Sequence, residues 1–150
     1  MNRNLIFLGA WLGLCFNLAA QTDESSEAPQ LWGALIRATD SPSASDRKVS
    51  EDLAGRLGKS FDFSTFEIIG EHTQPIGKEY HSWVVPSSEL FLRVDYKGIV
   101  EGGRSLHLQL WQQENVVVKT DVLLKSDSPI FFAGPAQGDD QLIFVVEMKR

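Results

Sequence analysis

Apolar and polar side chains alternate with a period of two along most of the chain after Thr65. Successive side chains of a β-strand point to opposite faces of its sheet, so this period predicts strands with one buried face and one solvated face. The alternation is clearest in residues 90–111, where the apolar positions are Leu90, Leu92, Val94, Tyr96, Leu106, Leu108 and Leu110. The same parity places Trp111 on the polar face of its strand.

Turn-forming residues divide the chain into seven or eight short strands. The other apolar runs are residues 31–38, 65–73, 80–85, 116–125, 130–133 and 142–148. Segments rich in Gly, Pro, Ser, Asp and Asn separate them, at 39–45, 98–103, 113–115 and 134–140. The last apolar run is nearly continuous, which predicts a central strand. The whole pattern predicts a mainly β fold, an antiparallel β-sandwich, rather than alternating strands and helices.

One early segment, residues 46–57, has helical periodicity instead. An apolar residue recurs at every fourth position, at Val49, Leu53 and Leu57. Ser45 or Asp46 is the predicted N-cap, and Gly58 is the predicted C-terminal stop. We therefore expect one α-helix, about residues 46–57, inserted into the β domain.

The first twenty residues predict a secretory signal peptide. Arg3 precedes an apolar run, residues 5–18, and Ala19 and Ala20 come before a polar, acidic stretch. The apolar run is shorter than the roughly 20 residues needed to span a bilayer. We predict cleavage after Ala20, with cleavage after Ala19 or retention of the segment as an anchor as the alternatives. The predicted location is the periplasm or the outside of the cell.

The rest of the chain is expected to form one domain behind a short tether. Residues 21–30 are polar and acidic and predict a disordered tether, which leaves residues 31–150 as a single β-sandwich domain. Cys15 is the one cysteine and lies in the predicted leader, so the mature chain would have neither a disulfide nor a free thiol. Lipidation of Cys15 is disfavoured because Leu14 stands where a small residue is needed.

The charge balance excludes two classes of partner. The chain has 20 acidic and 14 basic residues and a net charge of −6, and loss of Arg3 with the leader makes it more negative by one unit. Nucleic-acid phosphates repel such a surface, so a nucleic-acid partner is not expected. The sequence also has no basic amphipathic helix for anionic lipid, and no membrane span after cleavage.

Catalytic motifs are absent from the sequence. It contains no Gly-x-Ser-x-Gly elbow, no phosphate-binding loop and no His-Glu-x-x-His motif. His72 and His81 would face each other across one hairpin, where Glu71 or Glu79 would complete a metal site. We favour the alternative, polar residues on solvated strand faces, because a metal site needs several convergent ligands. No catalytic residue, metal ligand or cofactor is therefore assigned.

Trp83 and Trp111 are the candidate contact residues for a ligand or partner. An exposed tryptophan can stack on a sugar or anchor a protein, although large aromatic residues are more often buried. We expect an exported, non-enzymatic module that binds or scaffolds an envelope protein, with an exposed edge strand as the docking site. The alternatives are a carbohydrate-binding module using Trp83 or Trp111, and a metal-dependent hydrolase built on His72 and His81.

Three segments of the sequence resemble a loose group of small exported bacterial proteins rich in β-structure. They are Leu31–Ala38, Phe63–Ile69 and Gly134–Val146, of which the last is the most specific. Together with the helix they cover about half of the predicted domain. The resemblance implies export and a β-rich fold. No activity is established for the group, so it assigns no site residue.

Overall fold

A computed structural model describes residues 29–42, 45–76, 81–84 and 90–149, with residues 81–84 described for their backbone alone. The predicted leader, residues 1–20, and most of the predicted tether lie outside these ranges. The elements, in chain order, are β1 (Gln30–Thr39), α1 (Glu51–Ser60), β2 (Thr65–Pro75), β3 (His81–Val84), β4 (Leu90–Val100), β5 (Gly103–Gln112), β6 (Asn115–Leu124), β7 (Ile130–Gln137) and β8 (Asp140–Lys149).

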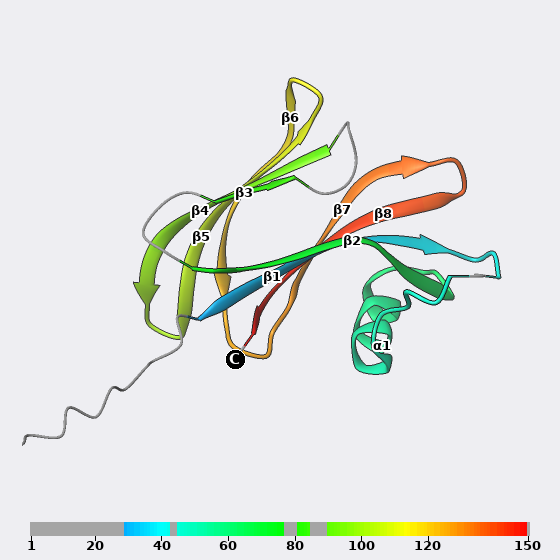
Figure 1. The fold of residues 1–150 in the computed structure, drawn as a ribbon, viewed down its shortest axis with the longest axis horizontal. Coiled ribbons are helices and arrows are strands. Elements are labelled where there is room, and N and C mark those ends of the chain that lie inside the picture. The colour runs from blue at the N-terminus through cyan, green and yellow to red at the C-terminus, as the bar shows by residue number, and fades with distance from the viewer. Residues whose placement is uncertain (1–28, 43–44, 77–80, 85–89, 150) are drawn as a thin grey trace, which may run out of the picture.

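The described strands form two four-stranded antiparallel sheets (Figure 1). Sheet A has the order β2-β1-β8-β7, and sheet B has the order β3-β4-β5-β6. The predicted fold class, an antiparallel sandwich of seven or eight strands with one inserted helix, is confirmed. Since β8 pairs with β1 on one side and β7 on the other, its predicted central position is also correct.

The main core lies between the two sheets and is built from alternate residues of their strands. Sheet B contributes Leu90, Leu92, Val94, Leu106, Leu108, Leu110 and Leu124. Sheet A contributes Leu31, Leu35, Leu142, Phe144, Val146 and Met148. The rings of Phe132 and Phe144 stack within this core, with centroids 5.5 Å apart. The period-two pattern of the sequence thus marks the inward faces correctly.

A second apolar cluster lies on the other face of sheet A, beneath α1. It contains Trp32, Ala34, Ile36, Ala38, Val49, Leu53, Leu57, Phe66, Ile143 and Val145. Figure 1 shows α1 on the side of sheet A away from sheet B. The molecule therefore has three layers: helix, sheet A and sheet B. Strand β1 is buried on both faces, which explains its compact apolar sequence.

The helix starts later than its apolar stripe predicts. It begins at Glu51 rather than near Asp46, because the preceding residues are extended and pair with the edge of β2. The backbone N–H of Ile68 donates to the carbonyl of Arg47 at 2.7 Å. Val49 is buried on the same cluster as Leu53 and Leu57 without being helical, so the four-residue spacing extended the predicted helix too far.

Both helix ends differ from the prediction. The N-cap is Ser50, whose Oγ accepts from the backbone N–H of Leu53 at 3.3 Å, rather than Ser45 or Asp46. Gly58 does not stop the helix, which continues to Ser60 and ends with Phe61 N–H donating to the carbonyl of Leu57.

Several predicted loops are shorter in the structure. The β4–β5 turn is confined to Glu101 and Gly102, although residues 98–103 were expected to be loop. Strand β7 continues through Gln137, with a register shift between Ala133 and Ala136. The predicted tether is also shorter at its end, since Gln30 already belongs to β1. Hydrogen bonding to a partner strand orders these Gly- and Pro-containing segments despite their loop-like composition.

Within the described ranges, no helix combines the length and the hydrophobicity needed to span a bilayer.

Candidate functional site

Aromatic, charged and amide side chains gather on the outer face of sheet B. The strand register aligns three successive rows from β4 through β5 to β6, namely Phe91–Trp111–Val116, Arg93–Gln109–Lys119 and Asp95–His107–Asp121. Their neighbours along the strands, such as Leu92 and Leu108, are buried in the core between the sheets. The alternation of a strand therefore places all three rows on the outer face.

The first row forms an apolar strip at one end of this face. Phe91 and Trp111 are half-buried, and Val116 is exposed. The β5–β6 register shifts between Leu110 and Trp111, so that β6 carries one extra residue at this point. Such a bulge turns neighbouring side chains outward, and Val117 is exposed beside Val116. The indole ring of Trp111 thus lies between the bulge in β6 and the first polar row.

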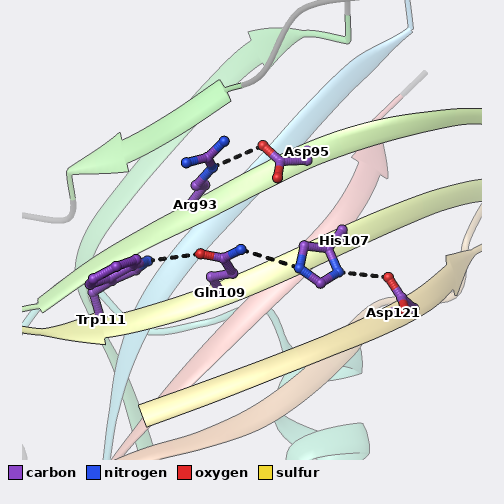
Figure 2. A network of polar contacts seen from close by, with 6 residues as sticks. All are labelled: Arg93, Asp95, His107, Gln109, Trp111 and Asp121. Carbon is purple, nitrogen blue, oxygen red and sulfur yellow. Dashed lines mark hydrogen bonds and ion pairs between the residues drawn. The ribbon is translucent and has the colours of Figure 1, made fainter. Parts of the chain in front are cut away.

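A chain of hydrogen bonds runs from Trp111 to Asp121 across the polar rows (Figure 2). Trp111 Nε1 donates to Gln109 Oε1 at 3.2 Å, and Gln109 Nε2 lies 3.2 Å from His107 Nε2. His107 Nδ1 lies 2.7 Å from Asp121 Oδ1 on β6. On β4, Arg93 Nε donates to Asp95 Oδ1 at 3.0 Å.

The bonding pattern sets the direction of this chain. An indole N–H can only donate, so Gln109 must present its oxygen to Trp111 and its amide N–H to His107. With this amide orientation, Nε2 of His107 accepts from Gln109 and Nδ1–H donates to Asp121, which is the bonding pattern of the Nδ1–H tautomer. The ring of Trp111 is thereby anchored through two further side chains to the neighbouring strand, and is positioned in advance of any contact.

The charges on the polar rows balance. Arg93 and Lys119 supply two cations, and Asp95 and Asp121 supply two carboxylates, in a chain with a net charge of −6. This face is therefore locally neutral, rich in donors and acceptors, and bordered by an aromatic ring. Such a surface suits an uncharged polar ligand better than an anion or a cation.

The structure places the two candidate tryptophans differently. Trp111 lies on the solvated face of its strand, as the alternation predicted, and its indole N–H is hydrogen bonded there. The backbone of Trp83 pairs with Leu92 in sheet B, and its side chain lies outside the described part of the structure.

The proposed pairing of His72 and His81 across one hairpin is wrong. His72 lies in β2 of sheet A, where it pairs with Gly33, and His81 lies in β3 of sheet B, where it pairs with Val94. The two residues belong to different sheets because β2 and β3 do not pair with each other. Among the described residues, no group of three or more His, Cys, Asp or Glu side chains is arranged to hold a metal ion.

An ion pair between the partly exposed Arg37 and the buried Glu67 lies at the end of sheet A. The carboxylate of Glu67 is 2% exposed and accepts from Arg37 Nε at 3.0 Å and also from Arg37 Nη2. This hydrogen bond, followed by the negative charge of Glu67, raises the pKa of Arg37 above its ordinary value. The pair lines a cavity of about 260 Å³ together with Thr39 and Asp140. Because the two groups neutralise each other, we assign the pair a structural role.

Sequence reasoning missed the unit formed by Gln109, His107 and Asp121. Gln109 and His107 share the polar face with Trp111 at two-residue spacing, so the alternation carried that part of the signal. Asp121 enters only through the β5–β6 register, which the sequence pattern does not specify.

Comparisons of the chain with protein-family models, with curated proteins and with solved structures found no match.

Proposed function

We propose that the protein is an exported, non-enzymatic binding module, and that it recognises a glycan chain on the outer face of sheet B. The observation that carries the proposal is the Trp111 ring, held in place at the border of two rows of polar side chains. A pyranose ring stacks an apolar face on indole, while its hydroxyl groups exchange hydrogen bonds with neighbouring amide, imidazole and charged groups. The leader-like residues 1–20 support export.

Two properties of the face support recognition of a neutral ligand without catalysis. Its polar groups bond to one another along the sheet. Acid–base catalysis would require them to converge on one point instead. Its charges balance, so the face carries no net charge that would select an anion or a cation over a neutral ligand.

A glycan panel tests the proposal. The protein is titrated with soluble cell-wall and plant oligosaccharides, followed by tryptophan fluorescence and by calorimetry. We expect at least one oligosaccharide to bind and shift the emission. Trp111→Ala should weaken that binding by about tenfold, since an aromatic contact is worth on the order of 1 kcal/mol beyond its buried area.

Two further variants complete this experiment. Gln109→Ala, which cuts the chain that anchors Trp111, should weaken binding less than Trp111→Ala does. Gln137→Ala, an exposed change in β7 of sheet A, is the matched control and should leave the affinity unchanged. A flat response across the whole panel, or equal affinity of wild type and Trp111→Ala, would refute glycan binding at this face.

The free edge of β6 favours a second candidate, an extended segment of an envelope protein. Among the described strands, β6 is the last of sheet B and pairs with β5 alone. Its exposed apolar residues are Val116 at 42%, Val117 at 47% and Leu123 at 40%. A long edge strand with apolar side chains is suited to the addition of a partner strand.

A capture experiment with a charged edge variant tests this second candidate. Wild-type protein should retain a specific protein from an envelope extract, and Val117→Lys should lose it, because an edge lysine opposes strand addition. Lys119→Arg, on the same strand, is the control and should retain it. Strand addition is rejected when no protein is retained specifically or when Val117→Lys retains it equally.

A further inference from the structure

A recess lies on the opposite side of the molecule, between the N-terminal end of α1 and the outer face of sheet A. Its volume is about 370 Å³, which is within the range of small-molecule sites. The residues that line it include Trp32, Asp52, Glu71, Glu147 and Lys149. We call it the Trp32 recess.

The position of Trp32 in sheet A explains how the recess forms. Further along the strands, Ala34, Ile36 and Val145 are covered by α1 and its neighbours. In the other direction the face turns polar, and the register places Trp32 beside Glu147 of β8. Trp32 Nε1 donates to Glu71 Oε2 at 3.0 Å, and the residue is only 8% exposed, so the ring is held firmly at this border.

The chain already places one ammonium group of its own in this setting. Lys149 Nζ lies 4.8 Å from the centroid of the Trp32 ring and 2.7 Å from Glu147 Oε2. A cation over an aromatic face, with a carboxylate beside it, is a favourable arrangement for an amine or a quaternary ammonium group. The Lys149 side chain is 47% exposed and carries its charge on a flexible stem, so it can leave the ring.

Each carboxylate of the recess has a cationic partner. Glu147 pairs with Lys149. Glu71 Oε1 lies 3.3 Å from Arg47 Nη2, and Asp52 Oδ2 lies 2.9 Å from Arg56 Nε. The positive end of α1 would favour an anion.

That end of the helix is already compensated, however. The Oγ of Ser50 accepts from the N–H of Leu53, and Glu51 and Asp52 lie in the first turn. The helix end therefore adds little positive field. Once Lys149 leaves the ring, Glu147 lacks its cation, which favours a replacing ammonium over an anion.

We propose that the Trp32 recess is a second binding site, distinct from the face of sheet B, and that it takes the alkylammonium group of an external ligand. The cation contacts the indole of Trp32 and is balanced by Glu147, the carboxylate with which Lys149 pairs. Lys149 competes for the same place, so its ammonium lowers the affinity for the external group.

Choline and its neutral isostere 3,3-dimethylbutan-1-ol are the probes, because they match in shape and differ in charge. Each is titrated into the protein by calorimetry, with the indole N–H resonances followed by NMR. Choline should bind at least about tenfold more tightly than the alcohol, since a cation–π contact contributes up to about 2 kcal/mol. Trp111→Phe identifies by elimination which resonances belong to the other face, and should leave choline binding unchanged.

Variants of the competing lysine give the sharper test. Lys149→Met should bind choline several-fold more tightly than wild type does, because the internal ammonium is gone. Adding Glu147→Gln to Lys149→Met should reverse that gain. Lys119→Met, an exposed lysine of sheet B, is the matched control and should behave as wild type.

Three results would overturn the proposal: equal binding of choline and the alcohol, no choline binding to wild type and Lys149→Met alike, or unchanged affinity in Lys149→Met. None of these bears on glycan binding by sheet B, which the glycan panel tests with its own variants.

Discussion

The ion pair between Arg37 and Glu67 shows how single residues of neighbouring strands depend on each other. Glu67 is buried, and Arg37 on the adjacent strand supplies its hydrogen bonds and raises its own pKa in doing so. A raised pKa means that the folded state holds the proton more tightly, so the contribution to stability is complete below the unfolded value. It is lost only as the pH rises through the folded value, which for arginine lies above the working range. Titration of Arg37 therefore adds no pH dependence to the stability across the working range.

Arg37→Met should lower the free energy of unfolding by about 2 kcal/mol, because it leaves the buried carboxylate of Glu67 without its cation. The double variant Arg37→Met with Glu67→Leu should recover most of the loss, since neither charge then remains. Urea denaturation of the three proteins at neutral pH measures both effects. Equal midpoints for the single variant and wild type would show that Glu67 does not depend on Arg37.

At the residue scale, the sequence predicted on which face of a sheet a side chain lies. It did not predict which side chain of a neighbouring strand that residue contacts. The solvated position of Trp111 followed from parity alone, because a strand side chain has only two directions. The link from His107 to Asp121, and the contact of Trp32 with Lys149, join residues of different strands. Such links depend on register and strand order, which a period of two leaves open.

At the scale of elements, the start of α1 shows where periodicity misleads. Val49, Leu53 and Leu57 are all buried in one cluster, yet only the last two are helical. An extended residue that approaches the sheet can bury its side chain beside a helix and imitate one more turn. The start is set instead by Ser50, whose hydroxyl satisfies an N–H group of the first turn.

The observed N-cap, Ser50, and the predicted N-cap Ser45 give different mutational results. Ser50→Ala should cost about 1 kcal/mol of stability, because the N–H of Leu53 loses its acceptor. Ser45→Ala should cost less, because its Oγ accepts from Arg47 N–H at an exposed position before the helix. Thermal melting of both variants makes the comparison, and a larger loss for Ser45→Ala would contradict a helix that begins after Ser50.

At the scale of the whole molecule, the sequence predicted two stacked sheets. It did not predict which strands belong to each sheet or their order. Alternation and turn residues specified short antiparallel strands, and the apolar run 142–148 specified a central one. Nothing in the pattern placed the last strand between the first and the seventh, or assigned His72 and His81 to separate sheets. These features follow from long-range pairing, since β1 meets β8 through Gln30 opposite Lys149.

A chain that ends at Gln137 should therefore fail to fold, because β8 supplies the centre of sheet A and part of both apolar clusters. We expect the truncated protein to show no cooperative thermal transition by circular dichroism and little protection from amide exchange. A cooperative transition near that of the full chain would show that the other strands are sufficient.

The order of the layers also separates the two proposed ligands. One meets the outer face of sheet B and the other meets the opposite face of sheet A, with a full apolar core between them. If both ligands bind as proposed, neither obstructs the other, and a single copy would bridge two different molecules. A surface that displays both a glycan and an alkylammonium group would then bind each copy through two contacts, with an avidity beyond that of either contact alone.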